Sequence, residues 1–288
     1  MRRWICSLLL GLLVLQIKSS RSVAQSPRNN TALYKQWASL KQPAAGPAQA
    51  IGAYQAGCLA GAVKIDKDGP GYALMRPSRR RFFAHPSLID YIQDLSARLQ
   101  AAKMPLLLVG DVSPPRGGPM RNGHNSHQTG LDVDLWLRMS RRRPTRLERE
   151  AWGAPSFVRG RKRLRSNWDT TQSKLVGLAA DSSAVSRVFV SPAIKKHLCQ
   201  TQRDAAWLHK IRPWWRHEEH IHVRLHCPAN SPACVPQDPV DAKDSGCGKE
   251  LDWWFSKEAD EEWRKIKADS SEREFPELPE ACKKIGAD

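Results

Sequence analysis

Two short segments of the 288-residue sequence combine histidine with carboxylate side chains. The first spans residues 123–134 and the second spans 217–222. Their candidate residues are His124, His127, Asp132, Asp134, His217, His220 and His222. Zinc in proteins is bound by imidazole nitrogens and carboxylate oxygens, and a catalytic zinc site leaves one of four positions open for water. A histidine on a loop, a carboxylate on the following strand and a histidine on a neighbouring strand would supply three ligands. The two segments therefore predict a catalytic zinc site.

Each segment includes a predicted strand with one polar face. Residues 131–137 alternate between apolar and polar side chains, which puts both aspartates on one face. Residues 219–226 alternate in the same way, with the histidines on the polar face. His220 and His222 are two residues apart, so both project from the same side of the strand. One of them can bind a metal while the other transfers protons.

A solvated edge strand is the simpler explanation for such polar faces. Asp132 and Asp134 could lie on the wet face of an edge strand, and we expect Arg224 and His226 to do so. The coincidence of two clusters favours a site instead. Signals for other hydrolases are missing, because the sequence contains neither Gly-x-Ser-x-Gly nor Ser-x-x-Lys.

The surrounding elements indicate one α+β domain. Apolar residues recur at helical spacing in 87–102, and residues 105–110 form an apolar run typical of a buried strand. Further predicted elements are helices near 170–180 and 192–211 and a strand near 185–190. Because the strands have one polar face, we expect a central antiparallel sheet.

The N-terminus has the pattern of a cleaved signal peptide over residues 1–24. Two arginines precede a 13-residue apolar run, and a small-x-small site ends at Ala24. The run is too short for a membrane span, which needs about 20 residues. We therefore expect export to the periplasm, a polar segment over 25–50 that leads into the domain, and a domain over 51–288.

The basic composition does not indicate a nucleic-acid partner. The chain has 46 Lys+Arg against 29 Asp+Glu, a formal charge of +17. Cleavage would remove four basic residues and no acidic one, leaving +13. An exported protein with this charge meets anionic wall polymers, which basic stretches such as 79–81, 141–143 and 159–165 could attract.

Six cysteines follow the predicted cleavage site, and an even number in an exported protein indicates three disulfides. They are Cys58, Cys199, Cys227, Cys234, Cys247 and Cys282. No Cys-x-x-Cys pair occurs, which argues against redox catalysis. Six cysteines allow fifteen connectivities, although Cys227 and Cys234 are placed to close a local loop.

The segments Ser126–Asp134 and His220–Arg224 resemble the penicillin-insensitive murein endopeptidases. These are zinc peptidases that share the fold of lysostaphin-type, D-Ala-D-Ala and hedgehog domains. The resemblance extends from residue 57 to 282, and further matching blocks are Arg80–Pro86, Gly110–Asp111, Arg187–Ile194 and Arg212–Trp214.

The resemblance implies specific roles and one substrate. It implies zinc ligation by His127, Asp134 and His222, a catalytic His220, and a further active-site His217. It implies hydrolysis of the D-alanyl–diaminopimelyl bridge of murein, without an acylated serine for penicillin to block. The implied disulfides are Cys58–Cys282, which would pin the charged C-terminal tail, Cys199–Cys247 and Cys227–Cys234.

One departure from the family concerns a second metal. Family members have been linked to additional zinc through His124 and an Asp-x-x-His pair, yet residues 141–168 contain no histidine, and Arg159–Lys162 is basic instead. We therefore expect one zinc, with His124 orienting substrate or a ligand. A D,D-carboxypeptidase and a non-catalytic, zinc-stabilised wall-binding module remain the alternatives.

Overall fold

A computed structural model describes residues 30–120, 124–268 and 276–287. Its centre is a seven-stranded mixed sheet. In spatial order the strands are β12 (Ile211–Pro213), β11 (Val185–Val190), β13 (His220–Leu225), β8 (Asp132–Trp136), β7 (Leu107–Val109), β5 (Tyr72–Leu74) and β4 (Asp68–Gly69).

The prediction of an antiparallel sheet is wrong for two of the strand pairs. β11 runs parallel to β12, and β5 runs parallel to β7, whereas the other neighbours are antiparallel. Parallel neighbours need a crossover connection, usually a helix. Here α2 (Pro86–Ala101) follows β5, and α5 (Pro192–Thr201) follows β11. The α+β class is confirmed.

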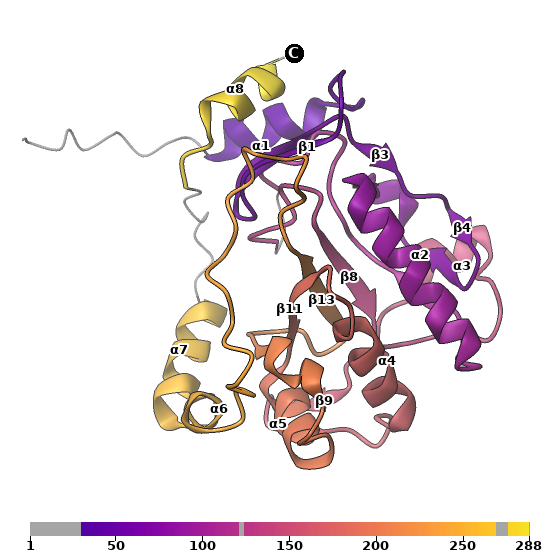
Figure 1. Cartoon of the computed structure of the whole chain (residues 1–288), viewed down its shortest axis with the longest axis vertical. Helices are drawn as coiled ribbons and strands as arrows, with labels where there is room; N and C mark the ends of the chain where they lie inside the picture. The colour runs from indigo at the N-terminus through magenta and orange to yellow at the C-terminus, as the bar shows by residue number, and fades with distance from the viewer. Residues whose placement is uncertain (1–29, 121–123, 269–275, 288) are drawn as a thin grey trace, which may run out of the picture.

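One face of the sheet forms the main core. Val133, Val223 and Val188 are in register across β8, β13 and β11, and all three are fully buried. The helices α2 and α4 (Thr170–Ala180) cover this face, on the right of the sheet in Figure 1. Burial of this apolar face leaves the opposite face of β8 and β13 to carry the polar residues.

Helix α2 confirms the predicted helix at 87–102 to within one residue. It begins after His85, whose ring nitrogen accepts a hydrogen bond from the Ser87 amide, and Pro86 occupies the first helical position. The four leucine and isoleucine residues at the predicted helical spacing are buried in the core: Leu88, Ile92, Leu95 and Leu99. The predicted helix at 192–211 is shorter, since α5 ends at Thr201 and a 3-10 turn covers Ala206–Lys210.

The remaining elements lie around the sheet. They are α1 (Asn30–Ser39), β1 (Gln49–Ala53), β2 (Ala56–Ala60), β3 (Val63–Lys64), a 3-10 turn (Pro77–Arg79), β6 (Phe83–Ala84), α3 (Arg146–Ala151), β9 (Val158–Arg159), β10 (Arg163–Leu164), α6 (Lys249–Trp253), α7 (Lys257–Ala268) and α8 (Glu280–Ala287). The predicted signal peptide lies outside the described residues, and part of the segment 25–50 forms α1. In the described ranges no helix is long and apolar enough to cross a membrane.

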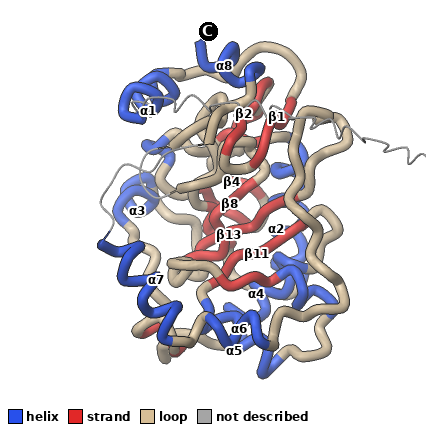
Figure 2. Tube along the Cα trace, turned by 90° about the vertical axis from the view of Figure 1, so that its left-hand side faces the viewer, coloured by secondary structure: helices blue, strands red, loops and turns tan. Residues whose placement is uncertain are grey.

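Three disulfides confirm the implied pairing. Cys58–Cys282 ties β2 to α8, Cys199–Cys247 ties α5 to the segment before α6, and Cys227–Cys234 closes a short loop after β13. Helices α1 and α8 lie together at one end of the molecule (Figures 1 and 2), where Trp37 packs against the first disulfide.

Loss of the Cys58–Cys282 bond is expected to destabilise the protein more than loss of Cys227–Cys234. The first bond closes 224 residues of chain and the second closes 7. The loop-entropy relation gives about 5 kcal/mol for the long loop and about 2 kcal/mol for the short one. Denaturant unfolding of the two Cys→Ser double variants measures the difference. Equal losses would contradict the entropic explanation.

Candidate metal centre and active site

Strands β8 and β13 bring the two predicted clusters onto one face. They are antiparallel neighbours, with His222 opposite Asp134 and Arg224 opposite Asp132. Directly opposed side chains lie within about 5.5 Å of each other. The register therefore joins the carboxylate of one cluster to the histidine of the other.

Three buried side chains direct their ligand atoms to a common point. His127 Nε2 lies 3.1 Å from His222 Nδ1 and 3.2 Å from Asp134 Oδ1, and His222 Nδ1 lies 3.4 Å from Asp134 Oδ1. Tetrahedral zinc with bonds of about 2.0–2.1 Å separates its ligand atoms by roughly 3.3–3.4 Å. The triangle formed by these atoms has the dimensions of one face of such a site.

The hydrogen bonds and charges around these side chains leave one carboxylate oxygen and two imidazole lone pairs available to bind a cation. Asp134 Oδ1 is buried and makes no hydrogen bond among the described residues. Leaving a buried carboxylate oxygen unpaired is costly. His127 Nδ1 is 2.8 Å from the Val112 carbonyl, which can only accept, so the lone pair of His127 is on Nε2. His222 Nε2 lies 3.1 Å from Asp132 Oδ1, outside hydrogen-bond geometry, and the negative charge of Asp132 favours a proton on Nε2, which leaves the lone pair of His222 on Nδ1. The two lone pairs thus point toward Asp134 Oδ1 and would bind a metal there.

The backbone at His127 is held in a strained conformation. His127 has φ of 66°, which is uncommon for a residue with a side chain. Its backbone N–H donates to Asp132 Oδ2 at 2.9 Å. Gly130 in the same loop has φ of 69°, and a Cβ there would lie 2.4 Å from the Leu59 side chain. The loop is therefore shaped to place the His127 ring.

Asp132 was a candidate from its place in the first segment, but no specific role was assigned to it from the sequence. It is fully buried and accepts from Arg224 at 2.8 and 3.1 Å, besides its contacts with both histidine ligands. Burial opposes ionisation, but Arg224 and His222 hold the pKa of Asp132 well below its usual value. The only signal in the sequence was its place two residues before Asp134 on the same face.

The edge-strand explanation is wrong for most of these residues. β8 is an inner strand between β13 and β7, and both of its aspartates are buried. Arg224, expected to be solvated, is also buried, because Asp132 neutralises its charge. His226 is exposed, as expected.

His124 lies at the rim of the same cluster. His124, His127 and Asp134 offer ligand atoms that all lie within 4.8 Å of one another. His124 Nδ1 is 3.7 Å from Asp134 Oδ2, and His124 Nε2 is 3.0 Å from Asp111 Oδ2. Asp111 directly follows the matched Gly110, but the sequence analysis gave it no role. Because Asp111 orients His124, this histidine can serve as a further ligand or hold substrate.

Asp111 also forms ion pairs with two arginines of the segment before β6. Arg79 and Arg81 each donate from Nη1 to its Oδ2 at 2.9 Å. Burial alone would raise the pKa of Asp111, but His124 and Arg81 lower it strongly. Two residues of the basic stretch 79–81 thus contact the site through Asp111. The spacing of residues in the sequence could not have predicted this contact.

His220 and His217 lie on the open side of the triangle. His220 Nε2 is 3.6 Å from Asp134 Oδ1, and its side chain is 25% exposed. The rings of His217 and His220 are 5.1 Å apart. Burial and the neighbouring histidines lower the pKa of both residues, and Asp134 opposes this effect. Both rings are therefore neutral near pH 7, the state required of a base.

Comparison with known proteins places the chain in a peptidase family, in agreement with the geometry of this site. The sequence model of the family described as penicillin-insensitive murein endopeptidase matches residues 50–287. The chain belongs to this family. The resemblance found from the two histidine motifs is thereby confirmed, and the family supports peptidoglycan endopeptidase activity.

Three relatives, each named penicillin-insensitive murein endopeptidase, show the extent of the similarity. The protein of Yersinia enterocolitica is 39% identical over 266 residues, covering 88% of each chain. The protein of Klebsiella pneumoniae is 44% identical over 222 residues, covering 76% of this chain and 81% of the relative. The protein of Haemophilus influenzae is 44% identical over 225 residues, covering 76% and 78%.

Proposed function

We propose that this chain is an exported zinc endopeptidase that hydrolyses the D-alanyl–meso-diaminopimelyl cross-links of peptidoglycan and is insensitive to penicillin. The observation that carries the proposal is the triangle of His127 Nε2, Asp134 Oδ1 and His222 Nδ1, with sides of 3.1–3.4 Å. These residues fit one Zn²⁺. Export to the periplasm rests on the signal-peptide pattern of residues 1–24.

Zinc held by these three residues would supply an acidified water and a Lewis acid for the scissile carbonyl. His220 is placed to take the proton of the attacking water, because its Nε2 faces Asp134 Oδ1 from the partly exposed side. No serine is acylated in such a reaction, so penicillin has no nucleophile to trap.

His217 is tied to the backbone, which limits its role. Its Nδ1 lies 2.8 Å from the Trp215 carbonyl, so this nitrogen carries the proton. In the neutral ring Nε2 is then an acceptor. Donation to an oxyanion or to the leaving amine would require the imidazolium form, which its lowered pKa disfavours. We therefore assign His217 to accept a hydrogen bond through Nε2, while the proton that His220 takes from the water is the one returned to the leaving amine.

The basic stretch Arg159–Lys162, where family members were linked to ligands of a second metal, stabilises the fold. Arg161 is buried and pairs with Asp260 of α7, and Lys162 Nζ is 2.6 Å from the same carboxylate. The Arg161 guanidinium also lies over the Trp215 ring at 5.3 Å. These contacts fasten α7 to the domain, and neither cationic side chain can act as a metal ligand, which supports a single zinc.

Defined cross-linked muropeptide dimers test the activity. The purified protein is expected to convert the dimer into two monomers with no release of free D-alanine. Release of free D-alanine from uncross-linked pentapeptide, with the dimer left intact, would instead indicate a D,D-carboxypeptidase. Addition of penicillin is expected to leave the rate unchanged.

His220→Ala separates an enzyme from a wall-binding module. Loss of a general base reduces turnover by about 10²–10⁴-fold, and we expect zinc content and sacculus binding to stay near wild type. His226→Ala is the matched control, since His226 is exposed further along the chain after β13. A rate for His220→Ala equal to that of the control would remove His220 from the mechanism.

A further inference from the structure

A polar pocket adjoins the metal centre on the same face of the sheet. Its volume is about 340 Å³. Residues from β11, β12 and later segments line it, among them Arg187, Phe189, Arg212, Trp214, Gln237 and Trp254. None of these residues takes part in the chemistry described above, so the pocket is a separate feature beside the site.

Phe189 forms the boundary between pocket and centre. It pairs with His222 across β11 and β13, and its ring centroid lies 5.4 Å from that of His222 and 6.4 Å from that of His217. Arg187, two residues earlier on the same face, pairs with Arg224. Diagonal neighbours of this kind lie about 7–8 Å apart, so Arg187 is within reach of a group bonded next to the scissile amide.

The charge of Arg187 is not neutralised. Among the described residues no carboxylate lies within 4.0 Å of its guanidinium, which instead donates to Gln237 Oε1 at 3.0 Å and to the Asp238 carbonyl. By contrast, Arg224 is paired with Asp132 and Arg212 with Glu250. Partial burial lowers the pKa of Arg187, and Arg224 and Arg212 lower it further. An anion beside Arg187 would relieve this repulsion.

The acidic residues of the lining are engaged elsewhere. Asp241 accepts from the Lys243 amide and Asp244 accepts from the Gly246 amide, each at 2.9 Å. Glu250 is held by Arg212. These carboxylates therefore do not pair with Arg187, whose charge remains to be balanced by a ligand.

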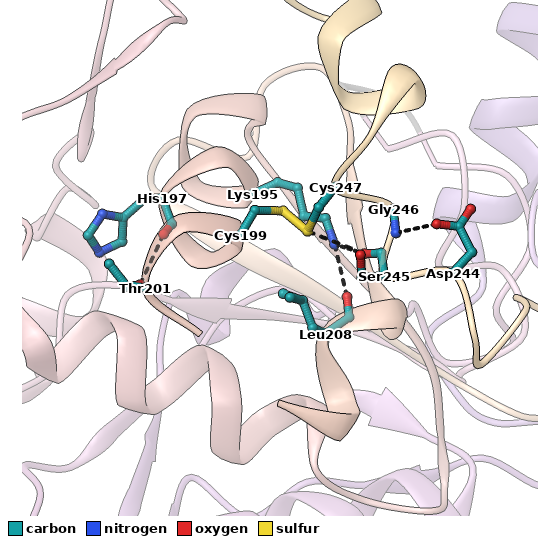
Figure 3. Close-up of a disulfide and its surroundings, with 9 residues drawn as sticks. All are labelled: Lys195, His197, Cys199, Thr201, Leu208, Asp244, Ser245, Gly246 and Cys247. Carbon is teal, nitrogen blue, oxygen red and sulfur yellow. Dashed lines mark hydrogen bonds between the residues drawn. A yellow bond between two sulfur atoms is a disulfide. The ribbon is translucent and has the colours of Figure 1, made fainter. Parts of the chain in front are cut away.

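The segment around Asp244, which lines the pocket, is fixed in place. The Cys199–Cys247 disulfide ties this segment to α5, and Lys195 of the same helix donates to the Leu208 carbonyl at 2.9 Å and to the Ser245 carbonyl (Figure 3). Gly246 allows close approach, since a Cβ there would lie 2.9 Å from Arg212 Nη1. A pocket with such supports is preformed, as small-molecule sites usually are.

We propose that Arg187 binds a free carboxylate of the peptide on the amine side of the scissile amide. Phe189 and Trp214 would pack against the aliphatic part of the residue that carries this carboxylate. The inference rests on the proposed function, because the diaminopimelyl residue carries a carboxylate on the carbon bonded to the scissile nitrogen. Arg187 is a specificity residue in this account. A guanidinium matches a carboxylate with two parallel hydrogen bonds.

Equilibrium binding tests the proposal without requiring turnover. The probes are an uncross-linked stem peptide containing meso-diaminopimelate and the same peptide with that carboxylate amidated. Charge-assisted hydrogen bonds of this strength correspond to about 10- to 100-fold in Kd. We expect wild-type protein to bind the free-carboxylate peptide tighter by this factor, and Arg187→Gln to bind both peptides equally weakly. Arg187→Lys should recover part of the preference.

The matched control is Arg203→Gln, which removes an exposed positive charge from a residue outside the pocket lining. It is expected to keep the wild-type preference. Equal affinity of wild-type protein for the two peptides, or an unchanged preference in Arg187→Gln, would overturn the proposal. Failure of the proposed function would appear separately, as an intact dimer in the cleavage assay.

Discussion

Replacing His222 by alanine is expected to remove the metal and to abolish dimer cleavage. His222 Nδ1 is one corner of the ligand triangle, 3.1 Å from His127 Nε2 and 3.4 Å from Asp134 Oδ1. With two protein ligands left, zinc is held weakly, and water activation and charge stabilisation are lost together. We expect cleavage to fall by about 10³-fold or more, with zinc well below one equivalent per chain by elemental analysis.

The control for this variant is again His226→Ala. It removes the same side chain from an exposed position close to the end of β13, so metal content and rate should match wild type. Circular dichroism shows whether each variant is folded. A folded His222→Ala protein that retained zinc and cleaved dimers would show that another set of residues forms the centre.

Asp132→Asn is expected to weaken both the fold and the metal site. The change keeps the shape of the side chain but removes the charge that pairs with buried Arg224. Breaking a buried ion pair costs about 3–5 kcal/mol because one charge stays uncompensated. Asp132 also orients His222 and the His127 backbone, and loss of such a partner lowers metal affinity by about 10- to 100-fold. Denaturant unfolding and zinc titration against a competing chelator measure the two effects.

A double variant separates the two roles of Asp132. Arg224→Met in the Asp132→Asn background removes the stranded charge, so stability should recover while zinc affinity stays low. Asp204→Asn, at an exposed position, controls for loss of one acidic residue. Recovery of both properties in the double variant would mean that Asp132 acts on zinc only through the general stability of the domain.

The alternation of residues was enough to predict β8 and β13 and the face on which their polar residues lie. A period of two fixes the side of each side chain once the strand is known. The pairing of Asp134 with His222 across 88 positions of sequence could not be obtained that way, since register depends on the whole sheet. The family resemblance supplied this association, and the structure gives its geometry.

Burial of the polar face was the feature that alternation could not predict. Arg224 looked solvated because its strand is half polar, yet Asp132 and Gln237 both accept from it and cover it. Similarly, Arg161 lies in the basic stretch 159–165, which was expected to attract wall polymers, yet its side chain is buried against Asp260. Charge alone indicates exposure, but partners far along the chain decide whether a charge can be buried.

Titration of metal-free protein with zinc, with metal content and dimer cleavage measured on the same samples, tests the central claim most directly. We predict no cleavage without metal, a rate that rises in proportion to bound zinc, and a plateau at one equivalent per chain. Cleavage by fully metal-free protein, or zinc binding that brings no cleavage of the dimer, would contradict a single-zinc endopeptidase built on His127, Asp134 and His222.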